Sequence, residues 1–178
     1  MAAPVQQFSD TVPVLLTERL RLRAPRLDDF EYHADFHASP RAVWEGGEKP
    51  RKEAWYNWSG DAASWGLRGY GAFSVEMNGA FVGEVGLYHP DHFPGPELGW
   101  FVIPEAEGQG IAFEAAQAVL SWIRASFDWP DITSIIEHGN ARSIALGLRL
   151  GGRIVVDPAY PGIDPGDVVI RHDLRRAA

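Results

Sequence analysis

The sequence predicts a single α/β domain in which helices flank a mixed sheet, with the element order βααβββαβαββ. Three observations predict this class. Apolar runs of strand length are interleaved with longer amphipathic stretches, the dipeptide Asn78-Gly79 joins two such runs, and a turn bracketed by Gly108 and Gly110 passes from another run directly into a helix. With 178 residues, the chain suits one domain over 1–178 with a full hydrophobic core.

The first third of the chain should contain one strand and two helices. Residues 1–12 are expected to be a loose N-terminal segment. Leucines alternate with arginines over 15–23, which is typical of a half-buried strand. A short helix is predicted over 27–38, with two aspartates in its first turn where acids suit the helix dipole. Pro50 then opens a second helical segment, which breaks near the glycines of 66–71.

An antiparallel hairpin follows, formed by strands over 72–77 and 80–88. Asn78-Gly79 between them is the dipeptide best suited to the positive φ angles of a type I′ turn. After a proline-rich loop, a strand is predicted over 97–103, and the glycine turn then leads into a helix that extends to about residue 127.

A further strand, a shorter helix and two final strands complete the prediction. They cover 132–137, 141–150, 153–156 and 168–174. Gly151-Gly152 stands at the end of the helix, and we interpret both glycines as a helix stop.

The composition excludes several classes of function. A formal net charge of −8 argues against a general nucleic-acid surface, which needs clustered cations to neutralise phosphates, and suits a cationic acceptor better. The chain has no cysteine, so disulfides, thiolate metal sites and cysteine nucleophiles are excluded. The start of the chain lacks the apolar core of a signal peptide, and no later apolar run reaches membrane-spanning length. We therefore expect a soluble cytoplasmic protein with no nucleic-acid or membrane partner.

The turn at 107–112 is suited to binding a phosphate. Unpaired backbone N–H groups and the positive end of the helix dipole meet there, and Gly108 and Gly110 remove side chains that would keep an anion from the backbone. No Lys-Ser or Lys-Thr pair follows the second glycine, and no third glycine completes a dinucleotide fingerprint, so a nucleoside triphosphatase and a Rossmann dehydrogenase are disfavoured. Taken alone, the same glycines also fit a purely structural turn.

Four motifs, in this order, resemble the GNAT N-acetyltransferases and specifically their RimJ/RimL-like branch. They are TERLRLR at 17–23, ELGW at 97–100, GQGIA at 108–112 followed by Glu114-Ala115, and NARS at 140–143 leading to Leu150-Gly151. Together they span nearly the whole chain, and four spaced motifs are more specific than one glycine turn. The resemblance implies a mostly antiparallel central sheet that is splayed between the fourth and fifth strands, and acetyl-CoA as the cosubstrate.

In this family the turn binds the pyrophosphate of acetyl-CoA through its backbone amides. The resemblance therefore implies a cofactor site at Glu107, Gly108, Gln109, Gly110, Ile111 and Ala112. It also implies that Val102 and Ile103 line the thioester on the splayed strand, with a backbone N–H near Val102 as the oxyanion donor. Relatives usually carry Gln or Arg at the first position of the turn, and we expect Glu107 to point to solvent at a modest cost in affinity.

Asn140 and Ser143 match two further positions of the family. Asn140 corresponds to an asparagine that hydrogen-bonds the pantetheine chain, and it also suits a plain helix N-cap. Ser143 corresponds to the serine that RimL-like enzymes are thought to place near the CoA sulfur, where a hydroxyl can donate a proton to the thiolate. Many other relatives carry a tyrosine at the position of Gly147. Ser143 is therefore the only candidate for the general acid that matches the family, and a water molecule is the alternative proton donor.

The reaction implied by the resemblance, attack of a neutral amine on the thioester, requires a group that takes a proton from an ammonium. Glu84 is the first choice because burial in its apolar strand would raise its pKa, although a solvated face or an arginine pair fits it equally well. Glu97 and Glu137-His138 are the alternatives. Trp44 and Trp58 are the aromatic residues expected to shape the acceptor slot.

The resulting hypothesis is an N-acetyltransferase that moves an acetyl group from acetyl-CoA to a primary amine, in a small molecule or at a peptide or protein N-terminus. The histidines show no convincing metal-ligand grouping, so no metal is predicted. A catalytically silent acyl-CoA-binding sensor is the alternative, and a generic nucleotide-binding α/β domain is a third hypothesis. The acceptor and the oligomeric state stay open; a homodimer is a common arrangement in the family.

Overall fold

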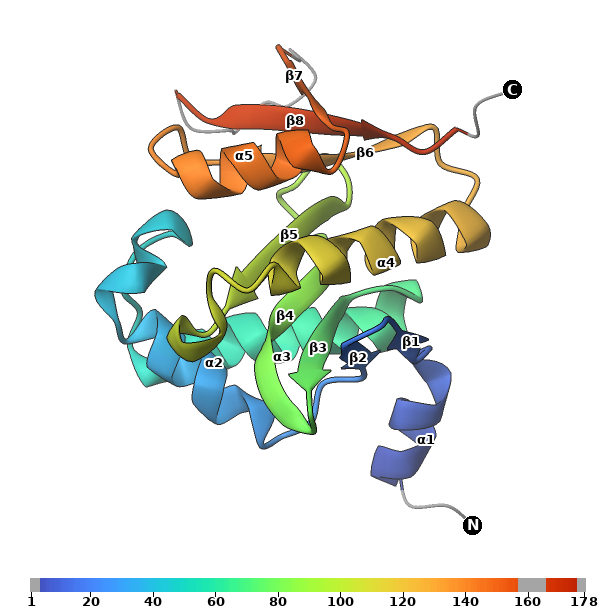
Figure 1. The fold of residues 1–178 in the computed structure, drawn as a ribbon. Helices are drawn as coiled ribbons and strands as arrows, with labels where there is room; N and C mark the ends of the chain where they lie inside the picture. The colour runs from blue at the N-terminus through green and yellow to red at the C-terminus, as the bar shows by residue number, and fades with distance from the viewer. Residues whose placement is uncertain (1–3, 157–165, 176–178) are drawn as a thin grey trace.

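The computed structural model describes residues 4–156 and 166–175, which form one eight-stranded sheet with helices on both faces (Figure 1). The strand order is β1-β2-β3-β4-β5-β6-β8-β7. The strands are β1 Leu15–Leu16, β2 Leu20–Arg23, β3 Ala72–Met77, β4 Ala80–Tyr88, β5 Glu97–Val102, β6 Asp131–Ile136, β7 Arg153–Val155 and β8 Val168–Asp173. The helices are α1 Pro4–Thr11, α2 Asp29–His37, α3 Arg51–Arg68, α4 Ile111–Ser126 and α5 Ala141–Arg149, with two 3-10 turns, η1 Pro40–Trp44 and η2 Pro104–Ala106.

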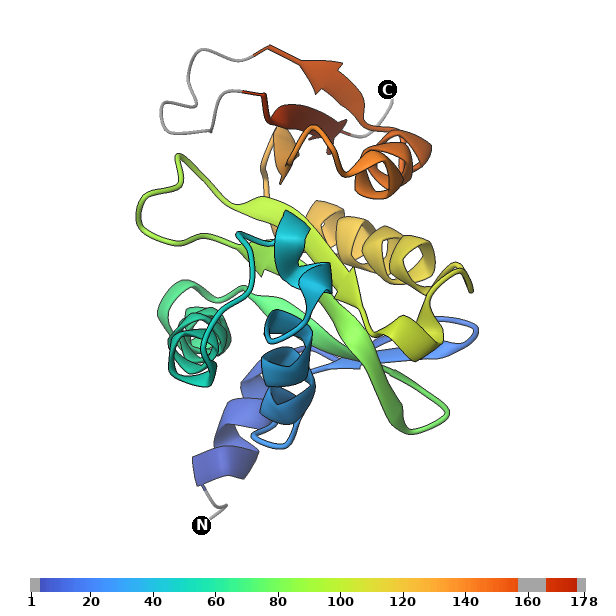
Figure 2. The same ribbon diagram turned by 90° about the vertical axis from the view of Figure 1, so that its left-hand side faces the viewer.

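Helix α4 covers one face of the central strands, and α2 and α3 cover the other, as Figure 2 shows. Buried apolar residues recur on α4 at four-residue spacing, each at most 2% exposed: Ile111, Ala115, Val119 and Ile123. They pack with Phe73, Val85 and Leu98 of the sheet in the main core. Because successive strand residues point to opposite faces, Glu84 and Glu97 face α2 and α3 instead.

Strands β5 and β6 are parallel neighbours that meet at a single registered pair, Glu97 with Thr133. By contrast, β4 and β5 pair over six residues. All other neighbouring strands are antiparallel. In Figure 1, β6, β8, β7 and α5 form a group that diverges from the strands β2 to β5. The predicted splay between the strands at 97–103 and 132–137 is therefore confirmed.

The predicted hairpin is also confirmed. Asn78 and Gly79 have φ angles of 53° and 80°, the left-handed values that a type I′ turn needs at both central residues. The register of β3 against β4 shifts between Val75 and Glu76, which marks a β-bulge.

The run at 15–23 is two short strands, where we predicted one. Thr17 closes the turn between β1 and β2: its Oγ1 accepts a hydrogen bond from the Leu20 amide at 2.9 Å and donates one to Glu114 at 2.5 Å. Glu114 lies 97 residues further along the chain. The Thr17 amide also donates to the Leu20 carbonyl at 3.0 Å, so local bonds and a contact from α4 together fix this turn.

One other predicted feature differs in the structure. The segment expected to be loose contains α1, and Val12 after it is 3% exposed in the main core. The predicted helix stop is present: Gly151 has a φ of 87°, and the Gly152 amide donates to the Gly147 carbonyl at 3.1 Å, so both glycines end α5. A Cβ on Gly152 would lie 2.8 Å from the Gly147 carbonyl oxygen and 2.8 Å from the His172 ring, so this glycine permits a close approach of α5 to β8.

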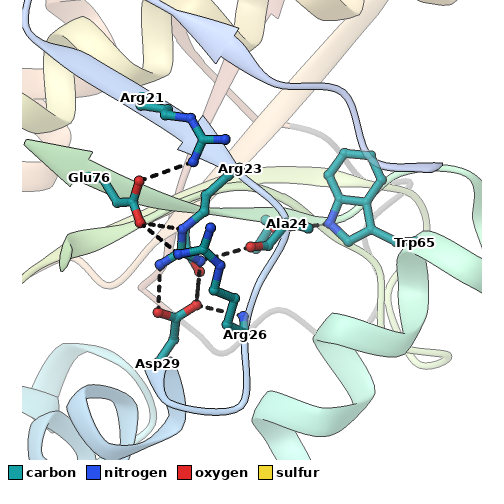
Figure 3. A network of polar contacts seen from close by, with 9 residues as sticks. Arg21, Arg23, Ala24, Arg26, Asp29, Trp65 and Glu76 are labelled. Carbon is teal, nitrogen blue, oxygen red and sulfur yellow. Dashed lines mark hydrogen bonds and ion pairs between the residues drawn. The ribbon is translucent and has the colours of Figure 1, made fainter. Parts of the chain in front are cut away.

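A buried ionic network fixes the start of α2 to the sheet (Figure 3). Arg23 on β2 is 5% exposed and makes two hydrogen bonds to Asp29, at 2.7 and 2.8 Å, and one to Glu76 on β3 at 2.5 Å. Asp29 also accepts hydrogen bonds from the Ser74 hydroxyl and the Arg26 amide. The network therefore sets where α2 lies on the face that carries Glu84 and Glu97.

Candidate active site

The glycine turn presents backbone amides at the N-terminus of α4. Gly108 and Gly110 have φ angles of 72° and 77°, which glycine adopts without strain. The Glu114 amide bonds to the Gly110 carbonyl, so the amides before it in the first turn lack acceptors within the helix. Arg19 braces the turn from the β1–β2 hairpin: it donates to the Gln109 carbonyl at 3.1 Å and to the Glu114 carboxylate at 2.7 Å.

A cavity of about 480 Å³, the cradle cavity, extends from this turn along β5. Its main lining comes from the glycine turn and first residues of α4, the end of β5, α5, and η1 with the residue after it, and Phe36 of α2 and Ala106 of η2 complete the wall. Its walls carry three arginines, Arg41 on η1 and Arg142 and Arg149 on α5. The cavity therefore combines free amides with cationic side chains, which suits a ligand with several phosphates.

Glu107 sits between two of these arginines. Arg41 forms an ion pair with one carboxylate oxygen, and Arg142 donates to the other at 2.9 Å. Arg149 lies instead over the Phe113 ring, 3.9 Å from its centroid. Glu107 thus links η1 to α5 across the mouth of the turn, and its charge is neutralised by guanidinium groups.

A second cavity of about 720 Å³, which we call the carboxylate cavity, lies under α3 on the other side of β5. The two cavities meet along β5, because seven residues line both: Phe36, Trp44, Glu45, Trp100, Phe101, Asn140 and Ser143. Five carboxylates line the second cavity: Glu45, Asp61, Glu97, Glu137 and Asp167. The cations Lys49 and Arg68 line it too, which leaves an acidic excess.

Burial raises the pKa of three of these carboxyl groups. The pKa of Glu97 is raised to about 8, first by burial and then by the charges of Glu45 and Asp61, although the Ile135 amide donates to it at 3.2 Å. Burial also raises the pKa of Asp61 to about 7, with a further contribution from the charge of Glu84.

The pKa of Glu45 is also raised, although Glu45 is more exposed than Asp61 and Glu97. Much of its side-chain surface is exposed, but that surface lines both cavities, and enclosure by the surrounding chain raises its pKa to about 7. Lys49 opposes the shift and Glu137 adds to it. A carboxyl that titrates near neutrality at the junction of two cavities is suited to general-base catalysis.

Ser143 and Asn140 lie at the same junction. The Trp100 indole N–H donates to the Ser143 Oγ at 3.3 Å, which leaves the hydroxyl proton of the serine available to another acceptor. The Asn140 Oδ1 accepts the Ser143 amide at 3.2 Å and so caps α5. The plain N-cap that we considered for Asn140 is thus present, and Asn140 also lines both cavities.

The amide of Val102 is directed toward the splay. Ile103 donates its amide to the Val82 carbonyl on β4 at 3.1 Å. Because successive strand residues direct their N–H groups to opposite edges, the Val102 amide points away from β4, to the side where β6 has diverged.

The Acetyltransferase (GNAT) domain family matches this chain over residues 19–153, more than half of its 178 residues. The chain belongs to the GNAT acetyltransferase family. It is an acetyl-CoA-dependent acyltransferase, and the cradle cavity stands at the splayed strands where the resemblance implied the acetyl-CoA site.

Solved GNAT structures share this architecture. An acetyltransferase from Agrobacterium tumefaciens is 37% identical, with a TM-score of 0.84 over 90% of this chain and 94% of that one. RimL, a ribosomal L7/L12 α-N-protein acetyltransferase in complex with coenzyme A, is 16% identical, with a TM-score of 0.70 over 90% and 98%. An acetyltransferase from Salmonella typhimurium that modifies the N-terminal serine of ribosomal protein L7/L12 is 16% identical, with a TM-score of 0.71 over 90% and 99%. The last two show a shared fold.

The cradle cavity of this GNAT domain gathers most of the residues predicted to bind the cofactor. Val102, Asn140, Ser143 and all positions of 107–112 except Gln109 line it. The Gln109 side chain donates instead to the Glu105 carbonyl at 3.1 Å. Ile103, just after the end of β5, lines neither cavity in the described part of the chain and, like Val102, packs partly buried against the main core.

Two other expectations about these cavities need correction. Glu107 does not point to solvent, because Arg41 and Arg142 hold it. Trp58 is 7% exposed and packs with Phe30, Ala34 and Ala54 between α2 and α3, so among the described residues it lines neither cavity. Trp44, the other predicted aromatic residue, lines both.

Glu84, the first choice for the base, is separated from both cavities. It is 3% exposed, and its Oε2 lies 3.8 Å from His33 Nδ1. His33 itself lines the carboxylate cavity. Glu97, the second choice, lines that cavity directly, as does Glu137. Neither a solvated face nor an arginine pair describes Glu84 in the structure.

Glu45 and Asp61 were not predicted as site residues from the sequence. The sequence does contain a pattern that could have identified Asp61. Polar residues recur on α3 at helical spacings of four, three and four, and all of them line the carboxylate cavity: Asn57, Asp61, Ser64 and Arg68. Glu45 stands just after η1 in an irregular segment, where no periodicity applies.

Within residues 4–156 and 166–175, no helix combines the length and apolarity needed to cross a membrane. In the same part of the chain, histidine and acidic side chains form no group of three or more that could hold a metal ion.

Proposed function

We propose that this protein transfers the acetyl group of acetyl-CoA directly to a primary amine. The observation that carries the proposal is the junction of the two cavities, where Glu45, Trp100 and Ser143 line both the phosphate-binding side and the acidic side of β5. One cavity offers amides and arginines to an anionic cosubstrate, and the other offers carboxylates to an ammonium.

The charge of the cradle cavity suits acetyl-CoA. The amides at the start of α4 would hold the diphosphate, with Arg41, Arg142 and Arg149 close to its charges. The side chain of Val102 and the junction residues would flank the arm that carries the thioester. When bound, acetyl-CoA supplies an activated acyl group.

Each junction group has a role in the transfer. Glu45 takes a proton from the ammonium, since its pKa of about 7 leaves it largely ionised at slightly alkaline pH. The Val102 amide donates to the oxygen of the carbonyl under attack. Ser143, held by the Trp100 indole, passes its hydroxyl proton to the departing sulfur and takes the second proton of the nitrogen, so the serine ends the transfer as a neutral hydroxyl. Trp100 is in this scheme a positioning residue.

The proposal is tested by CoA-thiol release with acetyl-CoA and a panel of primary amines. Turnover should depend on the amine, and Ser143→Ala should lower kcat by about 100-fold, the lower end of the effect of general acid–base groups. Ser121→Ala is the matched control, because Ser121 is exposed on α4 and bonds only to the Gln117 carbonyl of its own helix. Tight acetyl-CoA binding without turnover on any amine would support a silent sensor instead. A loss below about threefold would assign the proton transfer to water.

A further inference from the structure

We propose that the carboxylate cavity selects linear amines that carry two or more ammonium groups, and that Asp61 and Glu97 hold the ammonium that is not acetylated. This inference rests on the proposed amine acetylation. It names the class of acceptor from the charges, the unpaired polar groups and the aromatic walls of the cavity.

The carboxylates are distributed so that one ammonium cannot neutralise all of them. Glu45 lies at the junction with the cradle cavity, whereas Asp61 and Glu97 line only the carboxylate cavity, from α3 and from the start of β5. An amine that reacts at the junction therefore leaves the other two carboxyl groups without a cation, and their raised pKa values keep them largely protonated until one is bound. A second ammonium further along the same molecule matches them.

The cations in the cavity wall do not perform this role. Lys49 donates to the backbone carbonyls of Glu45 and Gly47, at 2.5 and 3.3 Å. Arg68 is exposed at the last turn of α3. None of the ion pairs among the described residues joins either cation to Asp61 or Glu97.

Buried polar atoms in the same wall have no hydrogen-bond partner among the described residues. His33 is 5% exposed and both of its ring nitrogens are unpaired, and the hydroxyl of Ser64, 8% exposed, is unpaired as well. Ser64 follows Asp61 by three residues on α3, so both face the cavity. Unsatisfied buried polar groups are costly, and the N–H groups of a bound ammonium would satisfy acceptors here.

Much of the remaining wall is aromatic. Seven phenylalanine, tyrosine and tryptophan side chains line the cavity: Phe36, Trp44, Tyr56, Tyr88, Phe93, Trp100 and Phe101. The Tyr88 ring lies against Gly99 on β5. A Cβ at this position would lie 2.8 Å from the ring, so the glycine leaves the space that the ring occupies. Aromatic faces pack against methylene groups and attract ammonium groups. The pattern of carboxylates separated by rings fits charges separated by an alkyl chain.

Three acceptors of matched size test the proposal: 1,4-diaminobutane, pentylamine and 4-aminobutanoate. Pentylamine replaces the distal ammonium by a methyl group, and 4-aminobutanoate replaces it by a carboxylate. We expect kcat/KM for the diamine to exceed that for pentylamine by at least about tenfold, the lower end of the effect of a close charge pair. The value for 4-aminobutanoate should be lower still.

Two variants test whether Asp61 and Glu97 cause the preference for the diamine. Asp61→Asn and Glu97→Gln are nearly isosteric, and each should reduce the ratio of diamine to pentylamine by at least about fivefold, mainly through KM of the diamine. Glu53→Gln on the exposed face of α3 is the matched control and should leave the ratio unchanged. Thermal melting of each variant confirms that it is folded.

The outcomes separate this inference from the proposed function. Equal kcat/KM for the diamine and pentylamine, or a ratio that both variants leave unchanged, would overturn the inference while acetylation stands. A serine-terminated peptide preferred over every diamine would overturn it as well. Absence of turnover with every amine would overturn the proposed function itself.

Discussion

Glu107 places a negative charge at the start of a turn that would hold a diphosphate, and two guanidinium groups surround that charge. Arg41 and Arg142 are partly exposed, so their pairs with Glu107 are each worth only about 0.2–1 kcal/mol. Together the three side chains carry one net positive charge. The unusual acid at this position therefore reduces the attraction for phosphates without removing it.

The substitution Glu107→Gln should tighten acetyl-CoA binding. It leaves two positive charges near the ligand instead of one, so Kd should fall by about two- to fivefold at low ionic strength, and the gain should shrink as salt screens it. Arg41→Gln should weaken binding. Calorimetric titration at two salt concentrations measures both. If Glu107→Gln weakened binding as much as Arg41→Gln, its main role would be to position the arginines.

Glu45 is expected to control the pH dependence of the reaction. A base must be ionised, and burial raises the pKa of Glu45 to about 7, so kcat/KM should rise as pH increases through about 7. Glu45→Gln should lower kcat/KM by about 10²–10⁴-fold and abolish this rise with pH. Initial rates between pH 5.5 and 9.5 check this.

The neighbouring Glu48→Gln is the control for this prediction, because Glu48 is exposed in the same segment and lines neither cavity. A Glu45→Gln enzyme with the wild-type kcat/KM and the wild-type pH dependence would exclude Glu45 as the base. Glu97, whose pKa is raised to about 8, would then be the next candidate, and kcat/KM would rise about one pH unit higher.

At the scale of elements, the position of α2 depends on the network of Arg23, Asp29 and Glu76 (Figure 3). Asp29→Ala removes one partner and leaves the buried guanidinium of Arg23 with a single carboxylate, which should lower the free energy of unfolding by about 3–5 kcal/mol. Urea unfolding at pH 7 measures this loss. Asp28→Ala is the control, because Asp28 is exposed and its side chain does not cap α2, and it should change stability by less than about 0.5 kcal/mol.

The same network gives a prediction about acid. Burial alone would raise the pKa of Asp29, but hydrogen bonds from Arg23, Arg26 and Ser74 hold it below its usual value. A depressed pKa in the folded state stabilises the protein above the unfolded pKa of about 3.9, and this contribution is lost as pH falls through the folded value. Below about pH 4, unfolding free energies of the wild type and Asp29→Ala should therefore converge. A constant difference down to pH 2 would contradict this.

Elements were predictable where local chemistry decides them. Asn78-Gly79 fixes a hairpin through its own φ angles, and the apolar spacing of α4 is independent of its partners. The break between β1 and β2 depends in part on a distant helix, because Glu114 holds Thr17 in addition to the local bonds between Thr17 and Leu20. The helix stop at Gly151-Gly152 was predictable, whereas the close approach of β8 to Gly152 was not, since those atoms belong to another strand.

At the scale of the whole molecule, the cofactor side was predictable and the acceptor side was not. The cradle is one continuous turn whose glycines and helix start are adjacent in sequence. The carboxylate cavity is assembled from α2, α3, β5, β6 and the segment after η1, and its carboxylates acquire raised pKa values only when these elements enclose them. Glu97, Glu137 and Trp44 were named in advance and line this cavity, but Glu45 and Asp61 were not.

Because the cradle cavity draws on η1, β5, α4 and α5 together, a ligand bound there should stabilise the whole fold. Acetyl-CoA at about 100 times its Kd contributes about 2.7 kcal/mol, which should raise Tm by roughly 5–11 °C for a domain of this size. Pantetheine, which lacks the phosphates, should give a much smaller shift at the same concentration, since the amides of α4 and the three arginines would have no anion to bind. Thermal melts with acetyl-CoA, pantetheine and ATP compare them. ATP stabilisation equal to that of acetyl-CoA would show that the cavity recognises phosphates alone, and would favour a generic nucleotide-binding domain.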